Sequence, residues 1–280
     1  MVNILTVDLE DWYQSSTELF EGDDKNKIIY PTDKVIKNTQ KLLKILSETG
    51  AKATFFVLGT VAESFPDLIH EIKSDGHEIA THGYSHHLVY KQSPEIFDED
   101  LKSSLSIIEG ITKEKVIGYR APYFSVTENS FWALDVMMRN GIKYDSSIFP
   151  MKRKLYGISN SPRYPYTTQE GMQEFPVTTF SLMGYIIPVG GGGYLRLLPY
   201  AFVKAGVRQA NKNKYPAVIY MHPYEIDADK RELPYGGKFI KDRFAKFTQD
   251  LNRTKFEGKF KKLLNESKFT SVMSYLNNNF

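Results

Sequence analysis

The sequence contains no cysteine, which excludes a disulfide framework and any metal site built from thiolates. A metal ion would have to be held by histidine and carboxylate side chains. The chain also lacks a strong charge. Its net charge of +3 is too small to indicate nucleic acid or an acidic membrane surface as a partner.

Long hydrophobic runs are absent as well. No window holds the roughly 18 apolar residues that a membrane-spanning helix needs. The first residues lead straight into a short apolar run, without the basic segment and longer apolar stretch of a signal peptide. We therefore expect a soluble, cytoplasmic protein without a transmembrane segment, whose oligomeric state the sequence leaves open.

What is present is the ordinary composition of a globular protein, with 41% hydrophobic and 25% charged residues over 280 positions. Short apolar runs that are typical of buried strands alternate with helical patterns. This alternation is the βαβ order of a parallel sheet. The patterns predict strands at about 2–7, 53–58, 77–80, 116–119, 142–144 and 217–221, and helices at about 33–49, 66–74, 94–110 and 130–140.

The clearest chemical signal lies in residues 76–87, where a predicted strand is followed by His82 and His86. Two imidazoles four residues apart can reach one ion from the same side of a helical turn or tight loop. Imidazole suits borderline metals such as zinc, and catalytic zinc usually has three protein ligands and one open position. A His-x-x-x-His spacing also occurs by chance, so other residues must complete the site.

The first predicted strand ends in Asp8-Leu9-Glu10-Asp11. Three carboxylates in four residues repel one another unless a cation or a basic group lies among them. The alternative is a solvated acidic turn. Reactive side chains also follow other predicted strands, and sites in parallel α/β proteins assemble at the carboxyl ends of strands. One shared metal site is therefore indicated by Asp8, His82, His86, Arg120, Asp145 and His222.

Over roughly residues 1–225, the sequence resembles the polysaccharide deacetylases of the NodB-homology group, also called carbohydrate esterase family 4. The resemblance rests on an ordered set of motifs. The residues in these motifs are closest to those of the exopolysaccharide-locus branch. Members of that branch carry Asp-x-Glu-Asp, Tyr-Asp-Ser-Ser, a Gly-Gly-Gly-Tyr segment and His-Pro-Tyr-Glu. The matching residues are Asp8 in the opening motif, His82-Gly83-Tyr84-Ser85-His86, Arg120-Ala121-Pro122-Tyr123 and Tyr220-Met221-His222.

The resemblance implies one α/β domain, a distorted parallel (β/α) barrel with fewer than eight regular strands. We expect its core at about residues 1–225 and a helical extension at about 226–280. The implied activity is metal-dependent removal of N-acetyl groups from N-acetylhexosamine units of a polysaccharide or its precursor. Acetate would be the product, one divalent ion such as Zn²⁺ the cofactor, and an N-acetylated glycan the partner. The alternatives are an allantoinase-like hydrolase of another small amide and a non-catalytic carbohydrate-binding barrel.

The resemblance also implies roles for individual residues. Asp8 would take the proton of the attacking water, with Arg120 as its charge partner. His222 would protonate the departing sugar amine, oriented by Asp145. The backbone N–H of Tyr123 would stabilise the oxyanion. The presence of both the candidate base and the candidate acid speaks against a barrel without catalysis.

One departure from the family pattern concerns the metal carboxylate. The family usually opens with adjacent aspartates, the second of which binds the metal, but Leu9 follows Asp8 here. An extended strand would place Glu10 on the same face as Asp8, whereas an early turn would favour Asp11. We favour the early turn. The predicted metal ligands are therefore Asp11, His82 and His86, with Glu10 as the alternative.

A second departure is that Asp145 has no tryptophan nearby in the sequence, so the wall of the pocket must differ from the family pattern. Residues 150–200 lie outside the strand–helix alternation, and loops of this length are usually functional or disordered. They contain a run of four glycines at 190–193 that is either a mobile turn or a backbone lying close to substrate. We predict that this loop lines the groove beside the metal through Gly192, Tyr194 and Arg196.

The Lys-rich C-terminal part carries an apolar stripe at helical spacing. Such a helix can pack on the barrel or lie on a membrane surface. We favour packing on the barrel. The stripe consists of Phe256, Phe260, Leu263 and Leu264.

Overall fold

The computed structural model describes residues 1–14, 30–151, 153, 156–227 and 251–279. Within these ranges the centre is a nine-stranded sheet in the order β10-β1-β2-β3-β4-β5-β7-β6, with β11 paired to the start of β1. All neighbouring strands run parallel except β6 and β7. The strands are β1 (Asn3–Leu9), β2 (Thr54–Val57), β3 (Glu78–Thr81), β4 (Gly118–Tyr119), β5 (Tyr144–Asp145), β6 (Tyr166–Thr167), β7 (Gln173–Glu174), β10 (Val218–Met221) and β11 (Phe269–Thr270).

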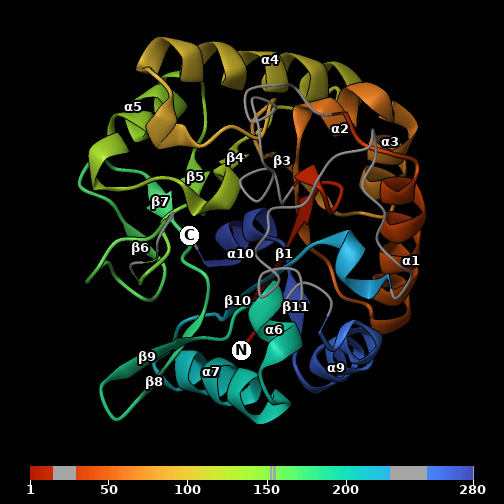
Figure 1. The fold of residues 1–280 in the computed structure, drawn as a ribbon, viewed down its shortest axis with the longest axis vertical. Helices are drawn as coiled ribbons and strands as arrows, with labels where there is room; N and C mark the ends of the chain where they lie inside the picture. Colours follow the sequence, from red (N-terminus) through yellow and green to blue (C-terminus); the bar gives the residue numbers. More distant parts are fainter. Residues whose placement is uncertain (15–29, 152, 154–155, 228–250, 280) are drawn as a thin grey trace.

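The sheet is strongly curled and open, so it forms a half-barrel (Figure 1). This confirms the predicted distorted α/β barrel. Only β1, β2, β3 and β10 have four or more residues in this sheet, because the other strands described in it have two each. The sheet is mixed rather than purely parallel, since β6 returns antiparallel beside β7.

Most helices form an outer layer around the curled sheet, whereas the C-terminal helix lies within the curl (Figure 1). The predicted helices at 33–49, 66–74, 94–110 and 130–140 are all present with small shifts of their ends. The helices are α1 (Lys34–Thr49), α2 (Gly59–Ser64), α3 (Pro66–Ser74), α4 (Pro94–Thr112), α5 (Trp132–Arg139), α6 (Gly193–Leu197), α7 (Tyr200–Lys212), α9 (Arg253–Glu266) and α10 (Val272–Asn279), with short 3₁₀ turns η3 (Val89–Lys91), η4 (Pro122–Phe124), η5 (Glu128–Ser130) and η6 (Pro223–Ile226).

Helix α1 shows how the sequence pattern produces an element. Its apolar side chains recur at helical spacing and are buried, including Val35, Leu42 and Leu46, so one face packs on the sheet. Gly50 ends the helix in a left-handed conformation with φ 67°, which glycine adopts without steric cost. Parallel strands covered by helices are buried on both faces, and all four residues of β2 are buried accordingly.

The C-terminal part of the chain packs on this core. Helix α9 buries its predicted apolar stripe, and β11 pairs with β1. The favoured packing of this helix on the barrel is therefore confirmed. The predicted extension at 226–280 is described only in part, because residues 228–250 lie outside the described ranges. Among the helices described, none is long and apolar enough to cross a membrane.

The segment between β5 and β10 is more ordered than its sequence pattern suggests. Besides β6 and β7 it contains a separate antiparallel hairpin of β8 (Thr179–Leu182) and β9 (Tyr185–Pro188). This hairpin packs on α7. The glycine run then carries the chain back beside β10. A Cβ at Gly191 would lie 1.9 Å from the carbonyl oxygen of Tyr220, so only glycine permits this close approach.

Candidate metal and catalytic site

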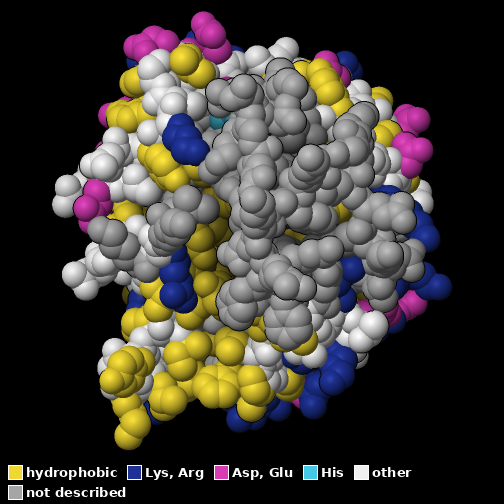
Figure 2. All heavy atoms as spheres, viewed as in Figure 1, with side chains coloured by type: hydrophobic (Ala, Val, Ile, Leu, Met, Phe, Trp, Pro, Cys, Tyr) yellow, Lys and Arg dark blue, Asp and Glu magenta, His cyan; other side chains and the backbone are white. Residues whose placement is uncertain are grey.

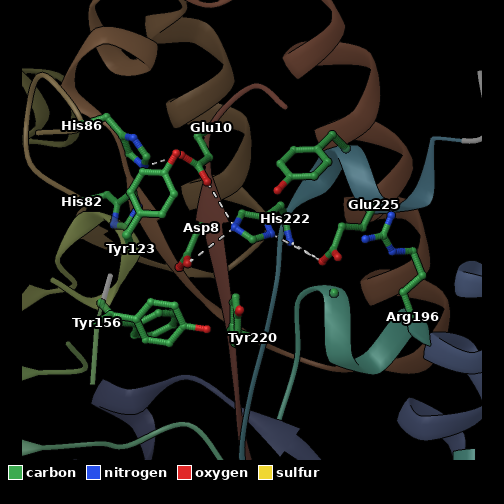
Figure 3. A pocket seen from close by; sticks show the side chains of 13 residues that line it. Asp8, Glu10, His82, His86, Tyr123, Tyr156, Arg196, Tyr220, His222 and Glu225 are labelled. Carbon is green, nitrogen blue, oxygen red and sulfur yellow. Dashed lines mark hydrogen bonds and ion pairs between the residues drawn. The ribbon is translucent and has the colours of Figure 1, made fainter. Parts of the chain in front are cut away.

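A pocket opens at the carboxyl ends of β1, β3, β4 and β10 (Figure 3). Parallel strands deliver their last residues to the same edge of a sheet, so side chains far apart in the sequence meet there. This arrangement was predicted from the alternation of strands and helices. The pocket is lined by Asp8, Glu10, His82, His86, Tyr123, Phe124, Tyr156, Gly193, Arg196, Tyr220, His222, Tyr224 and Glu225.

Three of these side chains could hold a divalent metal ion. One ligand atom from each of Glu10, His82 and His86 lies within 4.8 Å of the other two, and all three residues are buried. Glu10 Oε2 lies 2.8 Å from His86 Nε2. His82 Nδ1 lies 2.7 Å from the carbonyl oxygen of Arg120, which places the proton on Nδ1 and leaves Nε2 as the ligand atom. Two imidazoles and one carboxylate match the donor set of catalytic metal sites.

The protonation states of this cluster suit a metal ligand set. Burial lowers the pKa of His82 to about 4, so its ring is neutral at pH 7, as metal binding requires. Burial disfavours the charge on Glu10, but His86 and His222 outweigh burial and hold the pKa of Glu10 well below its usual range. Glu10 is therefore ionised at neutral pH.

Asp11, the carboxylate that we favoured from the sequence, lies outside this cluster. Its Oδ1 accepts a hydrogen bond from the N–H of Trp12 at 2.8 Å, and its Oδ2 accepts bonds from the N–H and the hydroxyl of Thr32. The physical reason is that the chain stays extended to the end of β1 at Leu9 and turns only afterwards. Alternation along the strand then keeps Glu10 on the face of Asp8. The structure therefore replaces Asp11 with the alternative, Glu10.

Asp8 and Arg120 form a fully enclosed ion pair beside the metal cluster. Arg120 Nη1 donates to Asp8 Oδ1 at 2.6 Å, and the Arg120 side chain has no solvent exposure. The guanidinium also donates to the hydroxyls of Thr6 and Ser146 and to the Ser146 carbonyl oxygen. Every arm of the guanidinium is thus held in place. The carboxylate of Asp8 faces the pocket from a fixed position.

His222 lies across the pocket from His82 and His86 and faces Glu10 and Asp8 (Figure 3). Its Nε2 is 3.1 Å from Glu10 Oε1 and 3.9 Å from Asp8 Oδ2, and its Nδ1 is 3.5 Å from Glu225 Oε2. Burial by itself would lower the pKa of His222, but the carboxylates of Glu10 and Glu225 outweigh it and raise the pKa to about 10. His222 therefore carries a proton at neutral pH and can give it to a ligand in the pocket.

Asp145, predicted to orient His222, has a different neighbourhood. Among the described residues, the carboxylates close to the His222 ring are those of Asp8, Glu10 and Glu225. Asp145 Oδ1 instead accepts a hydrogen bond from the hydroxyl of Ser147 at 2.5 Å. Glu225 is the carboxylate close to His222 Nδ1, because it follows His222 by one turn of η6, whereas Asp145 ends a strand farther along the sheet.

Asp145 is paired with a second carboxyl group, that of Glu174. The two residues are direct neighbours on β5 and β7, and both are fully buried. Burial raises the pKa of Asp145 to about 6. Burial and the neighbouring Asp145 together raise the pKa of Glu174 well above its usual range. We conclude that this pair shares a proton at neutral pH.

The backbone around the pocket is held in left-handed conformations that are uncommon outside glycine. The φ angles are 59° at His86, 53° at Tyr123 and 52° at Phe124. Such conformations cost energy and concentrate at functional sites. The ring of Tyr123 lies 5.2 Å from that of His86. The Arg120–Tyr123 motif therefore brings Tyr123 directly beside the metal cluster.

Comparison with known proteins identifies the architecture. Residues 22–144 match the family model described as "Polysaccharide deacetylase". This part of the chain is therefore similar to the polysaccharide deacetylase family. Residues 146–277 match a second model, a domain of unknown function (DUF3473). The histidines of the metal cluster lie in the deacetylase match, whereas His222 and Glu225 lie in the second match, so the pocket draws on both segments.

Curated relatives match this chain over part of their length. A peptidoglycan deacetylase-like protein FGM2 of Gibberella zeae is 31% identical over 43% of this chain and 35% of its own length. A peptidoglycan-N-acetylglucosamine deacetylase of Bacillus cereus is 28% identical over 39% of this chain and 44% of its own. A chitooligosaccharide deacetylase of a Bradyrhizobium strain is 33% identical over 35% of this chain and 43% of its own. Each match therefore spans less than half of the relative.

Solved structures share the fold over nearly the whole chain. One, a Mycobacterium smegmatis protein assigned to the polysaccharide deacetylases, has a TM-score of 0.56 and 18% identity and covers 99% of this chain and 90% of its own. Another is a mutant of a CE4 family pseudoenzyme, with a TM-score of 0.51 and 13% identity over 98% of this chain and 66% of its own. The deacetylase fold therefore occurs in a pseudoenzyme too, and activity must be argued from the site.

The loop predicted to line the groove beside the metal does so in part. Arg196 lines the pocket, as does Gly193, the neighbour of the predicted Gly192. Gly192 lies behind it against the ring of Tyr220. The Tyr194 hydroxyl is 3.5 Å from that of Tyr156, which does line the pocket.

Besides Gly193 of the glycine run, five pocket residues were not singled out as site residues from the sequence, namely Phe124, Tyr156, Tyr220, Tyr224 and Glu225. Glu225 could have been found, because it stands three residues after His222 within the His-Pro-Tyr-Glu motif. Tyr220 and Tyr224 stand in the two motifs that share His222, and Phe124 follows the Arg120–Tyr123 motif directly. Tyr156 stands in none of these motifs, so only the fold selects it for the pocket.

Proposed function

We propose that this chain is a metal-dependent deacetylase that removes the acetyl group from N-acetylhexosamine units of a glycan and releases acetate. The observation that carries the proposal is the buried cluster of Glu10, His82 and His86 at the mouth of the half-barrel, with Asp8 and His222 beside it. A ligand set, a candidate base and a candidate acid thus face one pocket. A barrel that only binds sugar would not need this combination.

Glu10, His82 and His86 would hold the ion, and we propose zinc because two histidines and a glutamate form a known catalytic zinc set. When bound, the ion supplies polarisation of the acetyl carbonyl group and acidification of the attacking water. Asp8 accepts the proton of that water. Arg120 keeps the Asp8 carboxylate in place through the 2.6 Å hydrogen bond. The backbone N–H of Tyr123 is the further donor that we propose for the oxyanion.

His222 completes the reaction. Hydrolysis forms a C–O bond to the acetyl carbon and breaks the C–N bond to the sugar nitrogen, which needs a proton to leave as an amine. The protonated His222 ring, held between Glu10 and Glu225, gives that proton. Because Asp8 and His222 have opposite proton duties, the rate should show a bell-shaped dependence on pH.

The substrate class is proposed from the family. The named activities of two relatives concern N-acetylglucosamine in peptidoglycan and chitooligosaccharides. For this chain we propose an N-acetylhexosamine polymer or its precursor, of the kind made at exopolysaccharide loci, because its Tyr144-Asp145-Ser146-Ser147 and His222-Pro223-Tyr224-Glu225 segments follow the wording of that branch. Tyr156, Tyr220 and Tyr224 line the pocket, and aromatic faces suit sugar rings.

The decisive experiment measures acetate released from a panel of N-acetylated oligosaccharides and of small non-sugar amides, with the zinc-loaded protein and with the protein after chelation. We expect release from acetylated amino sugars, loss on chelation and recovery with zinc. Release only from small amides would support an allantoinase-like hydrolase. Glycan binding without any acetate release would support a non-catalytic barrel, and either result would refute the proposal.

A further inference from the structure

The β8–β9 hairpin presents an apolar face to solvent. In its register Leu182 pairs with Tyr185 and Phe180 pairs with Ile187, and cross-strand partners lie on the same face of a sheet. Leu182 and Tyr185 are 44% and 77% exposed. Phe180 and Ile187 are partly exposed. Figure 2 shows the resulting patch, where hydrophobic side chains gather over the hairpin and α7 at the lower left.

The tip of the hairpin exposes a methionine. Met183 is 92% exposed, the largest fraction among the exposed hydrophobic side chains described. Met183 and Gly184 form the two-residue turn with φ 50° and 84°, a geometry for which Asn-Gly is the strongly preferred sequence. A methionine in this position does not stabilise the turn. Its exposed side chain therefore indicates a role other than stabilising the fold.

The hairpin is held firmly against the body of the protein. The side chain of Gln209 on α7 accepts a bond from the N–H of Ser181 and donates one to its carbonyl oxygen, both at 2.9 Å. Phe180 packs on Phe202 of α7 with ring centroids 6.4 Å apart. The exposed tip is therefore a fixed projection at the edge of the molecule (Figure 1).

The stretch of chain that contains the hairpin and α7 carries only basic charges. From residue 175 to residue 224, between Glu174 and Glu225, the chain contains no aspartate or glutamate. Lys204 in this stretch pairs with Glu266 and Arg196 lines the pocket, whereas Arg208, Lys212 and Lys214 are exposed. In Figure 2 the acidic side chains described on this face lie away from the apolar patch.

We propose that the β8–β9 hairpin is a docking element for the surface of an anionic lipid bilayer. Its apolar tip, Leu182, Met183 and Tyr185, enters the boundary between headgroups and acyl chains, and the basic residues of α7 contact the anionic headgroups. Interfacial binding of this kind combines buried apolar area with attraction to anionic lipid. Because β9 leads directly into Gly190–Gly193 beside the pocket, docking would bring the pocket close to the bilayer. A membrane-borne glycan could then reach it.

The test is flotation of the full chain with vesicles of phosphatidylcholine alone or of phosphatidylcholine mixed with phosphatidylglycerol, at low salt. We expect binding to the mixed vesicles and little binding to the neutral ones. The variant Leu182→Thr/Met183→Asn/Tyr185→Thr should lower the partition coefficient roughly tenfold or more, because the apolar area that enters the lipid is removed. Met183→Asn creates the preferred Asn-Gly turn, so the hairpin keeps its fold.

Two further variants make the result specific. Ile96→Ser on α4 removes a 55% exposed apolar side chain at the opposite edge of the molecule (Figure 1), and it should leave vesicle binding unchanged. Arg208→Ser/Lys212→Ser should weaken binding to mixed vesicles roughly fivefold for each charge removed.

Equal binding of wild type and the hairpin variant would overturn the proposal. So would a concentration-dependent dimer of the wild type that the hairpin variant abolishes, because the patch would then seat a second copy. Vesicle binding needs no acetate release, so failure here is distinct from failure of the deacetylase proposal.

Discussion

Two groups of buried carboxylates lie in the same half-barrel and behave in opposite ways. Glu10, at the end of β1, faces His86 and His222, which hold its pKa well below its usual range despite burial. Asp145 and Glu174, at the ends of β5 and β7, face each other, and burial raises the pKa of both. Burial disfavours a charged carboxylate in either place. The neighbours decide whether that carboxylate becomes an ionised ligand or a shared acid.

The two groups are linked by one side chain. Arg120 donates to Asp8 in the first group and to Ser146, the neighbour of Asp145, in the second. Burial and the neighbouring Asp145 raise the pKa of Glu174. The positive charge of Arg120 lowers it, but by less. The first group thus contains an ionised carboxylate, Glu10, beside a protonated histidine, His222. In the second group, Glu174 on β7 accepts a hydrogen bond from the N–H of Ile148, which follows β5.

The largest expected effect comes from removing the charge of the first group. Glu10→Gln should lose the metal and abolish measurable acetate release, because an amide is a far weaker ligand for a divalent ion than a carboxylate. Asp11→Asn is the matched control and should keep the metal. Metal content by mass spectrometry and acetate release would be measured together. Metal loss in Asp11→Asn with retention in Glu10→Gln would reverse the assignment.

Next in size is the loss of the proposed base or acid. Asp8→Asn and His222→Ala should each lower kcat by about 10²–10⁴, while the ligands Glu10, His82 and His86 still bind the metal. The measurement is steady-state acetate release, with metal content as the control. A variant that keeps near-wild-type turnover would remove its residue from the proposed mechanism.

The second group should show its shared proton as a dependence of stability on pH. A raised pKa means that stability is fully present below the unfolded pKa of 3.8 and is lost as pH rises through the folded value of about 6 for Asp145. That shift corresponds to on the order of 3 kcal/mol. Glu174→Gln gives Asp145 an amide donor in place of an acid, so this variant should gain stability relative to wild type between pH 4 and pH 7.

Denaturant unfolding of both proteins at the two pH values measures this difference, and the comparison cancels the titration of groups common to both. The charged or titratable side chains that bear on the pair are Arg120, Tyr119 and Tyr166, and all three are unchanged in the variant. A difference in unfolding free energy that does not change with pH would show that the two carboxyls do not share a proton.

The smallest expected effect concerns Glu225, which stands where the family pattern suggested Asp145. Glu225→Gln should lower kcat roughly tenfold with little change in KM, as for other partners that orient a functional histidine. Because this carboxylate helps to raise the pKa of His222, its loss should move the alkaline limb of the pH–rate profile to lower pH. Asp145→Asn should leave that limb in place. A shift in Asp145→Asn alone would restore the role implied by the resemblance.

Much of the architecture could be predicted from the sequence because it depends on local pattern. The strand–helix alternation, the helix end at Gly50 and the apolar stripe of α9 follow from periodicity and from backbone preferences of single residues. Parallel strands also share one carboxyl edge. The sequence therefore determined that Asp8, His82, His86, Arg120 and His222 would meet, although their sequence separations are large.

Only the tertiary structure decided contacts that depend on a turn or on an unrelated strand. Asp11 was favoured over Glu10 because the position of one turn cannot be read from residue types, and the strand proved to stay extended past Asp8. The partner of Asp145 is Glu174 rather than His222 because β7 pairs with β5, and such short strands carry no periodic signal. The exposed hairpin was missed for a similar reason. Phe180, Leu182, Tyr185 and Ile187 look like core residues in sequence, but α7 packs on β8 at Phe180 and leaves Leu182 and Tyr185 in solvent.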